Sequence, residues 1–163
     1  MFDPTTYTGF HTWLSLIALA TGIVVTWELI QARHAPGWTA VFLATAVATS
    51  VTGFGFPFTG ILPSHVLGAI ALVVLGFGIV ARYRFVLRGV WRWIYALTTV
   101  TSVYLLAFVA IAQTFQKVPA LQAPNLSAVL FTAAQVSALA VFAALAVVAV
   151  RTFRPPLAGR ALG

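Results

Sequence analysis

Residues 63–92 read PSHVLGAIALVVLGFGIVARYRFVLRGVWR, an apolar run followed by a basic one. The stretch 63–81 carries no charge and is close to the roughly 20 residues that a helix needs to cross a bilayer. Arginines follow at once, at positions 82, 84, 88 and 92. Because Lys and Arg accumulate in cytoplasmic connections, this boundary predicts a membrane-spanning helix that ends on the cytoplasmic side.

The composition of the whole chain supports the same prediction. Of 163 residues, 61% are hydrophobic and 7% are charged, whereas a soluble domain carries about 25% charged residues. Two acidic and nine basic side chains cannot cover a water-facing surface. A soluble enzyme, a disordered tail and a nucleic-acid-binding protein are therefore excluded. The absence of cysteine excludes a disulfide-stapled module, thiolate metal sites and thiol catalysis.

Four other stretches are also long and apolar enough to span a bilayer. Residues 1–163 are therefore expected to form one all-α integral membrane domain, a bundle of five transmembrane helices at approximately 12–31, 38–56, 63–81, 92–113 and 127–150. In lipid, helices pack through small residues because no hydrophobic force drives them together. Ala44 with Ala48, Ala134 with Ala138 and Ala140 with Ala144 have the four-residue spacing that suits such contacts.

The basic residues indicate how the five helices cross the membrane. With the N-terminus outside, eight of the nine basic residues fall on the cytoplasmic side and only Lys117 falls outside. This asymmetry predicts an outside N-terminus and a cytoplasmic C-terminus. A four-helix arrangement would place basic clusters on opposite sides, so we reject it.

His11 and His65 are the first candidates for chemistry. Each lies near the start of a span that begins outside, so the topology places both imidazoles at similar depth near the periplasmic face. Ionisable groups at membrane depth are costly and tend to be functional. Paired imidazoles can be axial ligands of a b-type haem, with Gly68, one turn below His65, leaving room for the macrocycle. A transition-metal ion, a proton-handling role and plain interfacial hydrogen bonding are the alternatives.

Glu28 is the only acidic residue within a predicted span. It lies about one turn from the cytoplasmic end of the first span, where it can reach water or pair with Arg33, Arg82 or Arg84. Carboxylates within spans also mark proton and cation pathways. Glu28 is therefore a candidate proton or ion site as well as an ion-pairing residue.

Two outer connections complete the candidate site. The segment 53–60 brings Phe56 and Phe58 beside glycines and a proline, which is typical of an aromatic-anchored turn or of a re-entrant lip. The facing segment 113–122 could cover it. That segment supplies the expected rim contacts Gln113, Gln116 and Lys117.

Three runs carry a resemblance to known sequences. The run FHTWLSLIALATG at 10–22, the segment TGFGFPF at 52–58 and the run QKVPAL at 116–121 resemble an uncharacterised family of small multi-pass bacterial inner-membrane proteins. This resemblance implies no activity and no residue role. A narrower similarity, confined to histidines near helix ends, is to the four-helix cytochrome b group. The chain departs from that group because it has too few histidines for two haems.

The residues favour a non-enzymatic polytopic protein of the bacterial inner membrane. No nucleophile and base can be paired, so we expect an accessory or ligand-binding protein with a haem or metal site at His11 and His65. Its expected partners are the lipid bilayer and either a second copy or a larger membrane complex. One alternative is a small channel or transporter for a solute, ion or proton, lined by hydroxyls such as Thr49 and Ser102. A second alternative is a b-type cytochrome for membrane electron transfer, with haem b as its cofactor.

Overall fold

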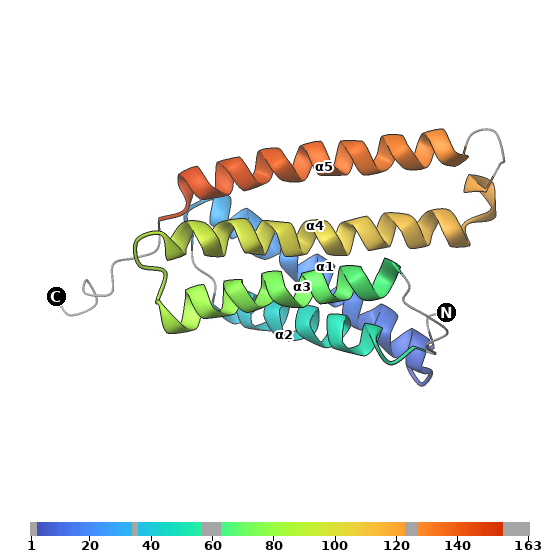
Figure 1. Cartoon of the computed structure of the whole chain (residues 1–163), viewed down its shortest axis with the longest axis horizontal. Coiled ribbons are helices and arrows are strands. Elements are labelled where there is room, and N and C mark those ends of the chain that lie inside the picture. The colour runs from blue at the N-terminus through green and yellow to red at the C-terminus, as the bar shows by residue number, and fades with distance from the viewer. Residues whose placement is uncertain (1–2, 34–35, 57–62, 123–126, 155–163) are drawn as a thin grey trace.

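The structure is a computed structural model that describes residues 3–33, 36–56, 63–122 and 127–154. These ranges contain five long helices and no strand (Figure 1). The helices are α1 (Tyr7–Ile30), α2 (Pro36–Gly53), α3 (Pro63–Ile79), α4 (Trp91–Lys117) and α5 (Ser127–Thr152). A π-helical turn, η1 (Val80–Arg84), prolongs α3, and a 3₁₀ turn, η2 (Pro119–Leu121), follows α4. The expected all-α fold is confirmed.

The five helices run up and down in one bundle. Helix α2 packs against α1 and α3, α4 packs against α3 and α5, and α1 runs obliquely behind them to contact α4 (Figure 1). Helix α5 lies at the edge of the bundle, where its neighbours are α4 and, less extensively, α1. Since the number of helices is odd, α1 begins and α5 ends at opposite ends of the molecule.

In the part of the chain that the structure describes, four segments are long and apolar enough to cross a membrane, so the chain is a polytopic membrane protein. They are Tyr7–Ile30, Ser64–Arg84, Trp91–Lys117 and Ser127–Thr152. Helix α2 has 18 residues and is not among them, because its threonines, its serine and its other polar positions lower its mean hydropathy. The fifth span and the inside–outside orientation therefore stay predictions.

Two predicted boundaries are wrong. Helix α1 begins at Tyr7, five residues before the predicted start, because Thr6 caps it by accepting the Gly9 N–H at 3.1 Å. Helix α4 continues to Lys117, so the segment 113–117, expected to be a connection, is helical. It ends at Val118, whose backbone is extended because the following residue is Pro119.

Two apolar clusters hold the helices together. The first joins Leu29, Tyr95, Ala149 and Phe153 near the ends of α1 and α5. The second lies deeper and joins Ala18, Phe42, Leu75 and Val103. Gly22 lies in this second cluster, where a Cβ atom would come within 2.7 Å of Val103 and 2.8 Å of Phe42. Close packing therefore depends on Gly22.

The expected small-residue contacts are only partly present, since Ala48, Ala134 and Ala138 are half-buried. Ala44, Ala140 and Ala144 are exposed on the lipid-facing side of their helices. The buried alanines include Ala18, Ala46, Ala81, Ala96 and Ala149, none of which is more than 2% exposed. A four-residue spacing shows that two residues share a face, but not which face packs.

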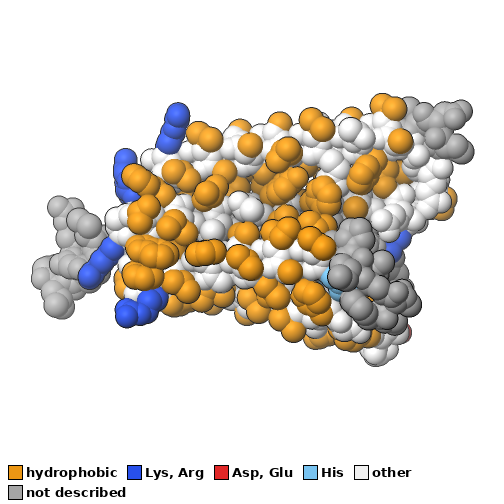
Figure 2. Space-filling view, viewed as in Figure 1, with side chains coloured by type: hydrophobic (Ala, Val, Ile, Leu, Met, Phe, Trp, Pro, Cys, Tyr) orange, Lys and Arg blue, Asp and Glu red, His pale blue; other side chains and the backbone are white. Residues whose placement is uncertain are grey.

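Charge separates the two ends of the bundle. The described arginines all lie where α1, η1 and α5 end and α2 and α4 begin, and Figure 2 shows them gathered there. We call this the arginine end; its residues are Arg33, Arg82, Arg84, Arg88, Arg92, Arg151 and Arg154. The opposite end, which we call the histidine end, carries His11, His65 and Lys117. The predicted separation of basic residues along the bundle axis is thus present in the fold.

Candidate functional site

The last turn of α2 is the platform on which the histidine end is built. A helix leaves its last carbonyl groups without partners inside the helix. Here the Thr52 carbonyl accepts hydrogen bonds from the Tyr7 hydroxyl and from the Gly55 N–H, the latter at 3.0 Å. Gly55 is needed for this approach, because a Cβ atom there would lie 1.9 Å from the Tyr7 hydroxyl. The start of α1 therefore caps the end of α2.

His11 is held by the same turn. Its Nδ1 lies 2.8 Å from the Thr52 Oγ1. The Thr52 hydroxyl also lies 2.7 Å from the Ala48 carbonyl, which can only accept a hydrogen bond. Since the hydroxyl has one proton and gives it to Ala48, His11 Nδ1–H is the donor to Thr52. The neutral His11 therefore carries its free lone pair on Nε2.

His65 lies against the next part of the same segment. It is 8% exposed, and its ring stacks on that of Phe54 with centroids 5.8 Å apart and an interplanar angle of 23°. Both histidines thus contact residues 52–54, so the fold places them at a similar level, as expected. The rings that they contact differ: Phe54 for His65, and Phe56 for His11 at 5.2 Å.

Gly68 does not leave an empty space beside His65. A Cβ atom on Gly68 would lie 3.2 Å from the Phe54 ring, so this ring already fills the space beside Gly68. The same ring covers a face of His65. The residues around His65 and Gly68 therefore do not fit a haem in this packing.

The expected rim contacts divide into two groups. Phe56 packs edge-on against Tyr7 and His11, with centroids 5.1 and 5.2 Å away. Phe58 lies outside the described residues. Gln116 belongs to a different place, a pocket of about 390 Å³ between the end of α4 and the start of α5. Its carbonyl accepts the Gln122 side-chain N–H at 2.6 Å.

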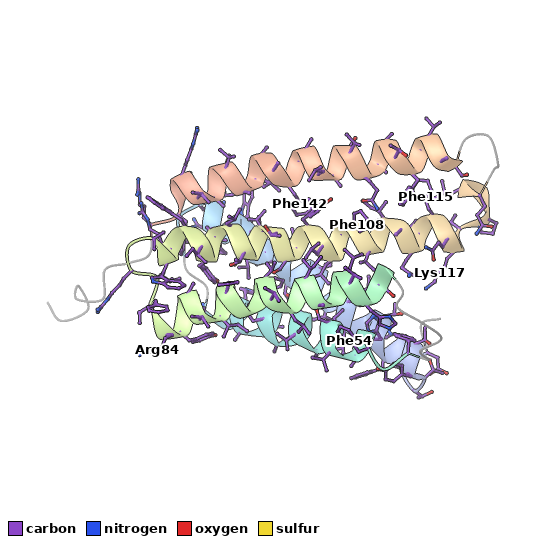
Figure 3. The ribbon with its side chains drawn as sticks, viewed as in Figure 1. Phe54, Arg84, Phe108, Phe115, Lys117 and Phe142 are labelled. Carbon is purple, nitrogen blue, oxygen red and sulfur yellow. The ribbon has the colours of Figure 1, made fainter. Side chains whose placement is uncertain are left out.

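Gln113 and Lys117 are exposed on the last turns of α4. Figure 3 shows Lys117 at the histidine end, on the side of α4 that faces α3, whereas Phe115 points toward α5. Lys117 is thus at the same end of the bundle as His11, whereas Phe115 belongs with α5 (Figure 3). That the segment 113–122 covers the turn after α2 stays a prediction.

A complete metal site is not formed by the described residues. Within residues 3–33, 36–56, 63–122 and 127–154, no three His, Asp or Glu side chains come together. An ion bound at His11 would need further ligands from water, His65 or a second chain.

Glu28 lies half-buried near the end of α1. Its carbonyl accepts the Arg33 N–H at 2.8 Å, which keeps the Arg33 backbone next to the last turn of the helix. Ion pairing of the Glu28 carboxylate with Arg33, Arg82 or Arg84 stays a prediction, as does its role as a proton or ion site.

The threonine and serine hydroxyls within α2 and α4 fall into two groups. Thr45 and Thr98 donate to carbonyls one turn earlier in their own helices, both at 2.7 Å. This is the usual behaviour of threonine within a helix. Thr49 and Ser102 differ, because among the described residues their buried hydroxyl oxygens have no hydrogen-bond partner.

Sequence reasoning missed a buried polar chain at the arginine end. Arg82 is 9% exposed, and its guanidinium donates to the Tyr95 hydroxyl at 3.4 Å. The Tyr95 hydroxyl lies 3.4 Å from that of Thr39 on α2. Arg82 directly follows the apolar run 63–81, and this position is the sequence feature that could have predicted its burial. Arg82 lies in the π-helical turn η1, in which Ala81 and Arg82 are the buried residues.

Comparison with known proteins gives no relative. No family model, curated protein or solved structure matches the chain. The chain is a small multi-pass membrane protein, and its function must be argued from its own geometry.

Proposed function

We propose that this chain is a non-enzymatic membrane protein that binds a transition-metal ion at its outer end through His11 Nε2. The observation that supports this most directly is the hydrogen-bond chain from His11 Nδ1 through the Thr52 hydroxyl to the Ala48 carbonyl. Metal-binding histidines use such a bond on their second nitrogen to fix tautomer and ring orientation. His65, held at the same end by Phe54, is the candidate second ligand.

The histidine end is the outer end of the bundle in our proposed orientation. The arginines mark the opposite end as cytoplasmic by the positive-inside rule, with α2 as a fifth span in a bacterial inner membrane. A site at His11 would then meet ions on the periplasmic side. The protein would serve as an ion-binding or accessory subunit of a larger membrane complex.

Metal binding is tested on protein purified with an affinity tag other than polyhistidine. Titration calorimetry with Cu²⁺ and Zn²⁺ should show one ion per chain. His11→Ala should abolish this binding, and Thr52→Val should weaken it about tenfold because it removes the acceptor for Nδ1–H. His34→Ala, which removes the third histidine, is the matched control and should leave the affinity unchanged. Equal losses in His34→Ala and His11→Ala would contradict the proposal.

The cytochrome alternative has its own test. A reduced-minus-oxidised absorption spectrum of protein from its host membrane should contain no Soret or α band if His11 serves a metal ion alone. A haem signal that disappears in both His11→Ala and His65→Ala would replace the metal proposal with a cytochrome.

One observation favours a channel as the second candidate. Thr49 and Ser102 keep buried hydroxyl oxygens without partners in the described part of the chain, and unpaired hydroxyls inside a bundle can line a hydrated path. Thr49→Leu or Ser102→Leu should then reduce proton or ion flux into proteoliposomes. Thr45→Leu, which replaces a hydroxyl bonded to its own helix, should not.

A further inference from the structure

A groove lies between α1, α4 and α5 in the half of the bundle nearer the arginine end. It has a volume of about 120 Å³, and its lining is almost wholly apolar. The lining includes Ile23, Thr26 and Ile30 from α1, Val103 from α4, and Phe142 and Leu145 from α5. Trp27 also lines it and is 59% exposed, so the groove opens toward the surroundings of the bundle.

Thr26 is the one side chain of this lining with a hydroxyl. It is 5% exposed, yet its Oγ1 has no hydrogen-bond partner among the described residues. Thr21, earlier in the same helix, donates to the Ile17 carbonyl at 2.7 Å. Thr26 does not satisfy its hydroxyl in this way. A buried hydroxyl without a partner is costly, and a rotation of the Thr26 side chain toward the groove would bring it to an acceptor bound there.

The groove ends beside positive charge. The Thr152 hydroxyl donates to the Leu29 carbonyl at 3.3 Å, so the end of α5 meets the end of α1. Arg154 follows the first of these ends and Arg33 follows the second, and both are exposed. Glu28 does not line the groove, because on a helix of 3.6 residues per turn it lies nearly opposite the face of Thr26 and Ile30.

We infer that this groove binds an anionic glycerophospholipid of the adjoining leaflet. An acyl chain lies along the apolar lining, and the phosphate pairs with Arg33 and Arg154. An ester carbonyl, which lies just below the phosphate in such a lipid, accepts the Thr26 hydroxyl. Basic positions at the ends of membrane helices attract anionic headgroups. This inference depends neither on the orientation of the chain nor on the site at His11.

The headgroup preference is tested by native mass spectrometry of the full chain, released from nanodiscs that contain phosphatidylglycerol or phosphatidylcholine with identical acyl chains. The wild-type protein should bind phosphatidylglycerol at least tenfold more tightly. The double variant R33Q/R154Q should reduce this preference to below twofold. The control R84Q/R88Q removes two exposed arginines of the same end, outside the ends of α1 and α5, and should retain it.

The groove itself is tested by two further variants. Leu145→Trp fills it and should lower retention of both lipids at least fivefold, whereas Val147→Trp, on an exposed position of α5, should not. Thr26→Val keeps the shape but removes the hydroxyl. The wild type should prefer ester-linked over ether-linked phosphatidylglycerol about threefold, and Thr26→Val should show no preference. Equal binding of both headgroups by the wild type, or equal losses in R84Q/R88Q and R33Q/R154Q, would overturn the inference.

Discussion

The histidine end and the arginine end of the bundle satisfy their polar groups differently. At the histidine end, Tyr7 and His11 bond to Thr52, so the polar groups close the terminus of α2. At the arginine end, Glu28 is the only acidic residue for seven described arginines, and Arg82 bonds to a neutral tyrosine. One end is therefore neutral and locally closed, while the other keeps a positive charge that favours an external anion.

The largest expected effect concerns Tyr95, which belongs to both the apolar cluster and the polar chain of the arginine end. It is 1% exposed and packs against Phe153 with ring centroids 5.8 Å apart. Tyr95→Ala should lower the free energy of unfolding by about 3–5 kcal/mol, because it leaves a large cavity. Thermal denaturation in detergent measures this.

Two variants separate the packing of Tyr95 from its hydroxyl. Tyr95→Phe retains the ring and should cost about 1 kcal/mol through the lost link between Arg82 and Thr39. Tyr83→Ala, at a position that is 59% exposed, should cost well under the loss in Tyr95→Ala. Equal losses at Tyr83 and Tyr95 would show that the buried chain does not stabilise the arginine end.

At the histidine end, Gly55→Ala should have the next largest effect. Its new Cβ atom would lie 1.9 Å from the Tyr7 hydroxyl, so Tyr7 must leave its bond to Thr52. Overpacking of this kind costs about 1–3 kcal/mol. Gly53→Ala is the matched control, since its Cβ atom would meet His11 at an ordinary 3.8 Å. If the two variants unfold at the same temperature, the cap of α2 by α1 contributes nothing measurable to the stability of the bundle.

Tyr7→Phe tests the same cap more gently. The Thr52 carbonyl would lose the Tyr7 hydroxyl but keep the Gly55 N–H at 3.0 Å, so no buried carbonyl is left without a donor. The expected loss is about 0.5–1 kcal/mol, and the Phe56 contact should persist. A loss as large as that of Gly55→Ala would mean that the hydroxyl, rather than steric fit, holds the two helices together.

Most of the bundle could be predicted from the sequence, because membrane helices are signalled by length and hydropathy alone. The clear errors are at boundaries: Thr6 caps α1 outside the apolar run, and α4 continues through the polar residues 113–117. Neither feature depends on hydropathy, so a prediction from hydropathy could not include either of them.

The candidate site was only partly predictable. Topology placed His11 and His65 at one end, but the interposed Phe54 ring depends on tertiary packing, which residue spacing does not encode. Arg82 shows the reverse failure. The sequence predicts it as one of four arginines in a connection, whereas in the structure it is buried within a π-helical turn. The sequence therefore predicts where the helices lie along the chain, but not which way individual side chains on them point.

The smallest predicted effect concerns Asp3, the acidic residue of the histidine end. The Thr5 hydroxyl donates to its carboxylate at 2.6 Å and the Thr5 N–H donates at 2.9 Å, and these bonds hold the pKa of Asp3 below its ordinary value of 3.8. A lowered pKa means that this turn is stabilised above about pH 4 and loses that stabilisation as the pH falls through the folded-state pKa. Thr5→Val removes the hydroxyl donor, so carbon-13 NMR titration of the Asp3 carboxyl should give a value closer to 3.8. Thr12→Val, whose hydroxyl bonds to Thr8, should leave the titration unchanged. An equal shift in both variants would assign the lowered pKa to the general field of this end rather than to Thr5, and this end would then not be as locally closed as its hydrogen bonds indicate.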